Sequence, residues 1–476
     1  MTPRKLLVTG LLLASFVVHG QNKQLLYDFI EIPQAAMINP GVITDFQWYS
    51  GVPTLSGISF QAGSSGLSVN DIFANDGLDI NDKIRNRAIA GMTPRDELSG
   101  TFQIEILNFG FRGRNPDNFY TGGMYLEGDA IGYWFRDYAI LAFEGNADRL
   151  NQRFDLGHLK TRGEMVNVFH FGVNKKVDSD LTVGLRGKLY SSILDFNSTR
   201  NKGFFITREG QNNILESTVN ADMQSRSSGF NEVRNAVDDG NVGAVFAKRA
   251  FFGGNLGLGL DLGFTYQLGE QTVLTGSLLD LGFIYHSNDV FNYTLNGDAT
   301  VEGVEIILPD AVSNPDTDFW QDLVDEIEGF IPFESNRKNY IAFRPTKLYA
   351  SLRYNFGEPL DSRANCQCGL SASTNSIRAK YTNSLGGQLY MINRPRGPQA
   401  ALTAFYQRRF GNFMALKTTY TIDKFSFANL GLGLNLQAGP VNIYAMADNL
   451  LSYRNIADSR YASFQLGLNI ISWGKK

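Results

Sequence analysis

The strongest constraint on the fold is an uninterrupted alternation of side chains over residues 255–268. Every even-numbered position carries Leu, Phe or Tyr, and every odd-numbered one carries Gly, Asn, Asp, Thr or Gln. Because successive side chains of a β-strand point to opposite faces, this predicts one apolar face and one small or polar face. A strand crosses a membrane in about 9–11 residues, so the length favours a membrane strand over a soluble sandwich strand. The substitution Leu260→Arg should then impair membrane assembly, whereas Gly259→Ser should be tolerated.

The same alternation recurs along the chain and indicates many strands of one kind. We predict an all-β fold, a transmembrane outer-membrane β-barrel of about 14–16 antiparallel strands, closed so that no edge is left unpaired in lipid. The alternation is clearest over 181–189, 347–356, 430–437 and 464–470, and further candidate strands lie near 98–112, 119–133, 138–146, 165–176, 242–250, 271–285, 370–381, 385–394, 399–410, 413–422 and 440–449.

The composition agrees with a wall that has one apolar and one polar face. The chain of 476 residues contains 49 Gly, 35 Phe and 20 Tyr, and its mean hydropathy is only −0.17. Lipid-facing apolar residues and lumen-facing polar residues average to such a bland value. The formal net charge of −4 gives no reason to expect nucleic-acid binding.

The first twenty residues have the pattern of a secretory signal peptide. Arg4 and Lys5 are followed by an apolar run over 6–18, which is short for a membrane span, and then by Val18-His19-Gly20. This predicts cleavage before Gln21 and export, with a retained membrane anchor as the alternative. No Cys follows the apolar run, so attachment of a lipid to a new N-terminal Cys is excluded.

The mature chain is predicted to have two parts. Residues 21–51, which contain Asn39-Pro40-Gly41, are too irregular for strands and too apolar for a disordered tail. They form a plug-like segment that lies either inside the lumen or across the periplasmic opening. Residues 52–476 form the barrel, with long connections near 61–97, 197–240 and 286–343, and the last of these is expected to contain a helix starting near Asp316 or Asp318.

Charged residues on the polar parity of these strands are expected to point into the lumen, because a charge that faces lipid is costly. They either select a solute or pair with carboxylates of the plug or lumen, such as Asp261. The lumen-facing candidates are Arg186, Lys188, Asp261, Lys347 and Arg353.

The two cysteines, Cys366 and Cys368, are separated by one residue. Export makes a disulfide between them possible, but this spacing is awkward for its geometry, and the alternative is a pair of structural thiols. No His lies near them, so the pair is weak as a metal site. No metal and no cofactor are expected. The mature chain has three His, namely His158, His170 and His286, without a recognisable catalytic partner, and we predict that it is not an enzyme.

Several short blocks resemble an uncharacterised family of Bacteroidota outer-membrane proteins that carries a domain-of-unknown-function label and is similar in architecture to FadL-type and PorV-type barrels. Asn39-Pro40-Gly41 looks like the Asn-Pro-Ala of the N-terminal segments of those barrels. One departure is Val168-Phe169-His170, where the family pattern has Tyr-x-Glu. The blocks are Leu107-Asn108-Phe109-Gly110-Phe111-Arg112, Phe143-Glu144-Gly145-Asn146, Leu181-Thr182-Val183-Gly184-Leu185-Arg186-Gly187-Lys188, Leu279-Asp280-Leu281-Gly282-Phe283-Ile284, Arg344-Pro345-Thr346-Lys347-Leu348-Tyr349 and Ala447-Asp448-Asn449-Leu450.

The resemblance implies a fold and an outer-membrane location, and it implies no reaction. Two function classes follow: a FadL-like channel for a hydrophobic or amphipathic solute, or a non-transporting subunit of an outer-membrane assembly or secretion complex. The expected partners are outer-membrane lipid, the barrel-assembly machinery, and other outer-membrane proteins or lipoproteins. The last strand, with Phe464, Leu466 and the late Trp473, resembles the C-terminal signal that the assembly machinery recognises.

Overall fold

The structure is a computed structural model that describes residues 23–210, 215–302, 333–359, 381–426, 429–452 and 455–473. Four sequence-based predictions lie outside the described residues. They are the signal peptide over 1–20, the helix near Asp316, nearly all of the strand near 370–381, and the Cys366–Cys368 pair.

Within the described residues, fourteen strand positions close into one antiparallel ring, as predicted at the lower end of the expected range. Two positions are each shared by two consecutive stretches of strand: β1 with β2, and β13 with β14. In ring order the strands are β1 (Trp48–Gly51) with β2 (Ile58–Ser64), β3 (Glu97–Arg112), β4 (Asn118–Tyr133), β6 (Thr161–Lys176), β7 (Leu181–Glu209), β9 (Asn255–Gln267), β10 (Thr272–His286), β13 (Tyr340–Phe343) with β14 (Lys347–Pro359), β15 (Tyr381–Arg394), β16 (Gly397–Phe410), β17 (Met414–Ile422), β18 (Asn429–Ala438), β19 (Val441–Asp448) and β20 (Tyr461–Ser472).

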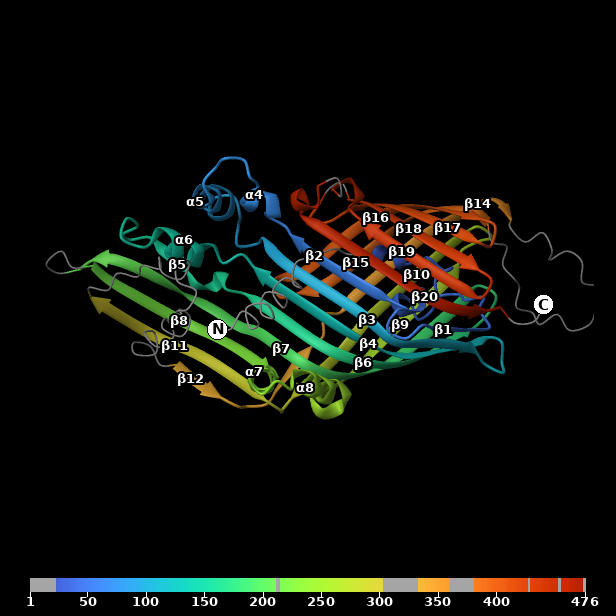
Figure 1. The fold of residues 1–476 in the computed structure, drawn as a ribbon, viewed down its shortest axis with the longest axis horizontal. Helices are drawn as coiled ribbons and strands as arrows, with labels where there is room; N and C mark the ends of the chain where they lie inside the picture. The colour runs from blue at the N-terminus through green and yellow to red at the C-terminus, as the bar shows by residue number, and fades with distance from the viewer. Residues whose placement is uncertain are drawn as a thin grey trace, which may run out of the picture.

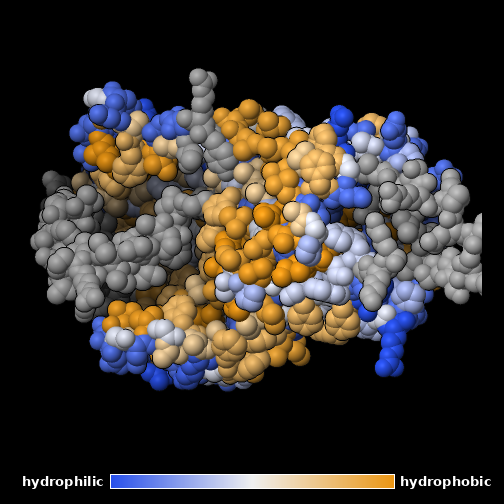
Figure 2. Space-filling model, turned by 45° about the vertical axis from the view of Figure 1, so that its right-hand side comes forward, coloured by the Kyte–Doolittle hydropathy of each residue, from blue (hydrophilic) through white to orange (hydrophobic). Residues whose placement is uncertain are grey.

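The alternation of side chains sorts the two faces of this wall as predicted. On β9, Leu258 is 59% exposed on the outside, whereas Asp261 is fully buried on the inside. The same parity holds on β7, β14, β18 and β20. Figure 2 shows the result on one face as an apolar belt across the middle of the molecule, with hydrophilic residues toward both ends. The short turns that join β3 to β4, β6 to β7 and β9 to β10 lie at one end, which we take as periplasmic.

At the other end the wall continues beyond the ring as an outer sheet (Figure 1). The outer part of β7 pairs with β5 (Arg153–Asp155) and β8 (Leu215–Ser228), and β8 pairs with β11 (Val290–Glu302), which pairs with β12 (Phe333–Asn336). Much of the described part of the predicted loops 197–240 and 286–343 is therefore strand. The prediction was wrong because a strand outside the membrane needs no apolar lipid face, so its sequence lacks the alternation.

Helices occupy the outer connections and the start of the chain. Two predicted strands, 138–146 and 242–250, are instead α6 and α8, because short apolar runs do not distinguish helix from strand by periodicity. Among the described residues, no helix is long and apolar enough to span a membrane. The helical elements are α2 (Lys23–Leu26), α3 (Ala35–Ile38), α4 (Val69–Phe73), α5 (Ile80–Lys83), η1 (Ile84–Ile89), α6 (Arg136–Glu144), η2 (Leu156–His158), α7 (Phe230–Asp238), α8 (Val242–Lys248), η4 (Arg249–Gly253), η6 (Leu450–Ser452) and η7 (Ile456–Asp458).

Candidate functional site in the lumen

The N-terminal segment, residues 23–42, lies inside the ring and shares a core with the lumen face of the wall. Most of its apolar side chains are buried, Leu25 and Phe29 completely, and Ile30 is partly buried. The ring of Tyr27 stacks on that of Tyr349 of β14 at 5.1 Å. The predicted boundary at residue 51 is too late, because β1 already pairs with both β3 and β20 from Trp48 onward. The wall residues of this shared core are Tyr125, Val166, Val168, Tyr190, Leu279, Ile284, Tyr349, Tyr390, Ile392, Ala401, Ala415, Tyr444 and Met446.

Side chains of the wall hold the main chain of this segment. Its carbonyl groups cannot pair within α2 and α3 alone, which are only four residues long each, so they need other donors. Arg186 donates to the carbonyl oxygens of Ala36 (2.9 Å) and Met37 (2.5 Å). Other donors to carbonyl oxygens are Lys417 and Gln388 to Tyr27, Arg353 to Asp28, Ser277 to Ile38, Asn174 to Pro40 and Val42, and Thr265 to Gly41.

The three plug candidates, Asn39, Pro40 and Gly41, lie against glycines of the wall. A Cβ on Gly184 of β7 would lie 2.0 Å from the carbonyl oxygen of Pro40, and one on Gly263 of β9 would lie 2.2 Å from Asn39 Oδ1. No larger residue fits between the two main chains at this point. Glycine on the lumen parity of these strands therefore brings segment and wall into direct contact.

Four of the five predicted lumen residues belong to one buried ion network. Arg186 Nε donates to Asp261 at 2.7 Å, and both side chains are almost completely buried. Lys188 Nζ lies 3.0 Å from Asp261 and 2.6 Å from Asp280. Lys347 Nζ lies 2.9 Å from the other oxygen of Asp280. Each carboxylate is thus shared between two cations, which offsets the large desolvation cost of burying such charges.

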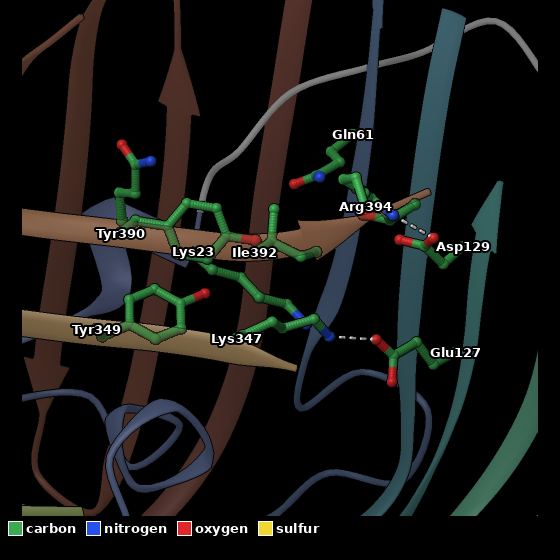
Figure 3. Close-up of a pocket in the computed structure, with 11 residues that line it drawn as sticks. Lys23, Gln61, Glu127, Asp129, Lys347, Tyr349, Tyr390, Ile392 and Arg394 are labelled. Carbon is green, nitrogen blue, oxygen red and sulfur yellow. Dashed lines mark hydrogen bonds and ion pairs between the residues drawn. The ribbon is translucent and has the colours of Figure 1, made fainter. Parts of the chain in front are cut away.

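The network continues across the lumen to Glu127 of β4, as Figure 3 shows, and to Glu164 of β6. Glu127 accepts from Lys347 and from Arg344, each at 2.9 Å. Arg344 also contacts Glu164 at 2.5 Å. A separate pair, Arg394 and Asp129, lies at 2.5 Å on the outer side of the same space, and Figure 3 shows both Arg394 and Lys347 directed at carboxylates of β4.

Arg353, the fifth predicted residue, lies apart from this network, near the periplasmic end of β14. Its Nη1 donates to the carbonyl oxygen of Asp28 at 3.1 Å. The carboxylate of Asp28 accepts from Ser351 at 2.8 Å. Among the described residues, the hydrogen bond and the ion pair of Arg353 both go to Asp28, so Arg353 holds a turn of the N-terminal segment against the wall.

The alternation of side chains in the sequence did not predict that Asp280, the central carboxylate of the ion network, faces the lumen. Counted along β10 from Leu274 and Leu278, Asp280 would face lipid. A β-bulge between Leu278 and Leu281 shifts the register, and Asp280 takes a left-handed φ of 59° there. The bulge turns its side chain into the lumen. By contrast, Glu127 lies on the regular lumen-facing alternation of β4, so the sequence pattern could have predicted that it faces the lumen.

His170 is buried in the lumen, and its ring centroid lies 5.7 Å from that of Tyr125. One further prediction changes here. The expectation that Ser is tolerated at Gly259 is wrong, because a Cβ there would lie 2.2 Å from the hydroxyl of the buried Tyr190. A small lumen residue therefore marks a place that is already filled.

Little free space remains around the ion network. Two cavities border it, each with a free volume of about 20 Å³, which is room for about one water molecule. Lys23, Glu127, Lys347 and Tyr349 line both. As the described residues form them, neither of these two cavities has room for an organic solute.

The closed antiparallel ring, its apolar belt and its polar interior define a β-barrel of the outer-membrane type. Residues 40–448 match the model of a family described as a family of unknown function (DUF5723), and the chain belongs to this family. No protein of curated function matches the chain.

Several solved structures of barrels are similar over most of the chain. The toluene transporter TbuX of Ralstonia pickettii is 10% identical with a TM-score of 0.39, and the match covers 93% of each chain. A FadL homologue of Pseudomonas aeruginosa is 9% identical with a TM-score of 0.40, covering 92% of this chain and 94% of that one. The toluene transporter TodX of P. putida is 9% identical with a TM-score of 0.37, covering 94% and 93%.

Proposed function

We propose that this protein is a channel of the outer membrane for an amphipathic solute, and that its N-terminal segment is a plug that must move before the solute crosses. The observation that carries the proposal is how the segment is held. It takes no part in the sheet, and side-chain hydrogen bonds from the wall to its carbonyl groups fix it in place. Such bonds can be exchanged for bonds to water, whereas the strand ladder of the wall cannot open without loss of the barrel.

The width of the ring supports a passage. A barrel of about eight strands is filled by its own side chains, and one of about 16–18 strands leaves an aqueous channel. A ring of fourteen strands lies between these cases, and here the N-terminal segment supplies the missing filling. Removing it would take away the filling that residues 23–42 give to the lumen.

The surface under the segment supports an amphipathic solute. Aromatic and aliphatic wall residues such as Tyr349, Tyr390 and Ile392 lie beside the charged groups of Lys347 and Glu127. A passage freed of the segment would offer both kinds of surface side by side. A solute with an apolar body and a polar group matches that combination.

The second candidate function is a non-transporting subunit of an outer-membrane complex. The water-sized cavities around the ion network favour it, since a structural barrel needs only a filled lumen. In that case the outer sheet and helices would be the docking surfaces, and mild detergent extraction should recover the same companion proteins reproducibly.

Deletion of residues 23–42, with the signal peptide and β1 kept, separates the two functions. If the segment is the plug, the variant should show a higher single-channel conductance in planar bilayers than the full chain. A variant that lacks residues 70–89, an equal length of the outer helices, is the control and should keep the conductance of the full chain. Heat-modifiability on gels verifies that both barrels are folded.

The result that would overturn the proposal is a folded deletion variant with unchanged conductance. Release of entrapped solutes from liposomes then refines the solute class. Through the open variant we expect faster release of a small amphiphile than of a sugar of similar size. Equal release rates would contradict the preference for an amphipathic solute, but not the role of the N-terminal segment as a plug.

A further inference from the structure

A helical insert, residues 229–254, interrupts one strand of the wall. β8 ends at Ser228 and β9 begins at Asn255. Both strands pair with the same neighbouring strand, β7. Asn255 Nδ2 donates to Ser228 Oγ at 2.6 Å, which joins the two strand ends. The wall is therefore continuous, and the insert, which contains α7, α8 and η4, leaves it and returns. Figure 1 shows α7 and α8 at the lower edge of the strands.

The depth of the insert follows from the register of the strands beside it. One row across the wall runs from Asn167 of β6 through Ser191, Leu256 and Tyr285 to Ile341 of β13. The last three residues are 43%, 46% and 51% exposed, as lipid-facing residues are, but Asn167 and Ser191 are completely buried. They lie on the lipid-facing parity, and the insert covers them.

Both covered residues are polar, and the insert supplies their partners. Asn167 Nδ2 donates to the carbonyl oxygen of Ala250 at 3.0 Å, and Ser191 Oγ donates to that of Arg249 at 2.6 Å. The amide of Phe252 donates to Ser191 Oγ at 3.1 Å. Without the insert these side chains would face hydrocarbon with no hydrogen-bond partner, which costs several kcal/mol per group.

The insert directs one charged side chain, that of Arg249, inward and its Phe251 and Phe252 outward, while Arg234, Asp238, Asp239 and Lys248 are exposed. Arg249 is fully buried and donates to the carbonyl oxygen of Ile193 at 2.7 Å and to Glu232 at 2.9 Å. Phe251 and Phe252 are 54% and 48% exposed.

The backbone at Phe252 adopts a strained conformation that places its ring on the outer surface of the wall. Its φ is 69°, a left-handed value that is rare for a bulky residue, and its ring stacks on that of Phe169 at 4.7 Å. Phe169 belongs to the next row of the wall, which includes the lipid-facing Leu258.

We propose that the insert is a lid embedded in the outer boundary of the membrane, where it seals a polar window in the lipid-facing wall and presents Phe251 and Phe252 to lipid acyl chains. Lipid is the occupant because the register places the exposed rings at the depth of Leu256, Leu258 and Tyr285, so that they continue the apolar belt.

Tryptophan quenching tests the depth of the insert. The protein has four Trp, which are replaced by Phe before a single reporter, Phe251→Trp, is introduced. In vesicles of phosphatidylcholine with dibrominated acyl chains, its emission should be quenched as strongly as that of Leu258→Trp on the lipid face. Phe73→Trp, at a position 71% exposed on α4, is the aqueous reference and should instead be quenched by acrylamide. A Phe251→Trp reporter that follows the aqueous reference overturns the proposal.

A rescue experiment tests the sealing role in case the reporter variant does not fold. Replacement of residues 229–254 by a short Gly linker should strongly reduce heat-modifiable barrel, because Asn167 and Ser191 become exposed to lipid. Adding Asn167→Leu and Ser191→Leu to this deletion should restore the barrel, since the row is then apolar throughout. Equal yields of the two deletion variants contradict the proposal.

Discussion

The two faces of the same strands are built by different rules. On the outside of β9, every second residue from Leu256 to Tyr266 is exposed. Any apolar side chain can face lipid at these positions. On the inside, Asp261 touches two cations and Gly263 touches the main chain of another segment. The outer face is specified by composition and the inner face by particular partners. A substitution outside should therefore matter through its polarity, and one inside through the partner that it leaves behind.

The largest effect is expected from Asp280→Leu in the lumen. This change removes the shared partner of Lys188 and Lys347, and an uncompensated buried charge costs about 3–5 kcal/mol. The free energy of unfolding should fall by about that amount in a urea titration of the barrel in phospholipid vesicles.

The matched variant is Asp280→Leu combined with Lys188→Met. Arg186 still pairs with Asp261 in this variant, and Lys347 still pairs with Glu127, so much of the stability should return. If the double variant is no more stable than Asp280→Leu alone, the lumen face does not depend on charge pairing.

A smaller loss is expected from Leu260→Arg on the outer face of β9. An Arg near the bilayer midplane of a barrel costs about 2–4 kcal/mol, and the same titration, with heat-modifiability as a check on assembly, measures it. Leu260→Met is the control and should remain close to the parent. Should Arg and Met behave alike, the assignment of this face to lipid is wrong.

The smallest loss of stability is expected from Ala substitutions at two glycines of β7 that lie on opposite faces of the wall. In Gly184→Ala the new Cβ would lie 2.0 Å from the carbonyl oxygen of Pro40, whereas in Gly187→Ala the nearest atom lies 4.0 Å away. Overpacking costs about 1–3 kcal/mol, so Gly184→Ala should lose about that much and Gly187→Ala nearly nothing. A reversed order in the urea titration would mean that the N-terminal segment does not lie against Gly184.

Local pattern was enough to predict the wall. Alternation over 255–268 and its repeats sorted Leu258 to lipid and Arg186, Lys188, Asp261, Lys347 and Arg353 to the inside, because the two-residue period of a strand needs no tertiary knowledge. The same reasoning failed where a bulge breaks the period, at Asp280, and where no lipid enforces it, in β8 and β11.

By itself, then, the sequence determined that this chain forms a closed membrane barrel with an apolar outside and a polar inside, since those properties follow from residue type and period alone. Only the tertiary structure decided which lumen groups meet, how residues 23–42 fill the ring, and that residues 229–254 cover Asn167 and Ser191. These features depend on contacts between strands far apart in sequence. A side chain shows its polarity in the sequence, but its partner is set by register, bulges and the path of the chain.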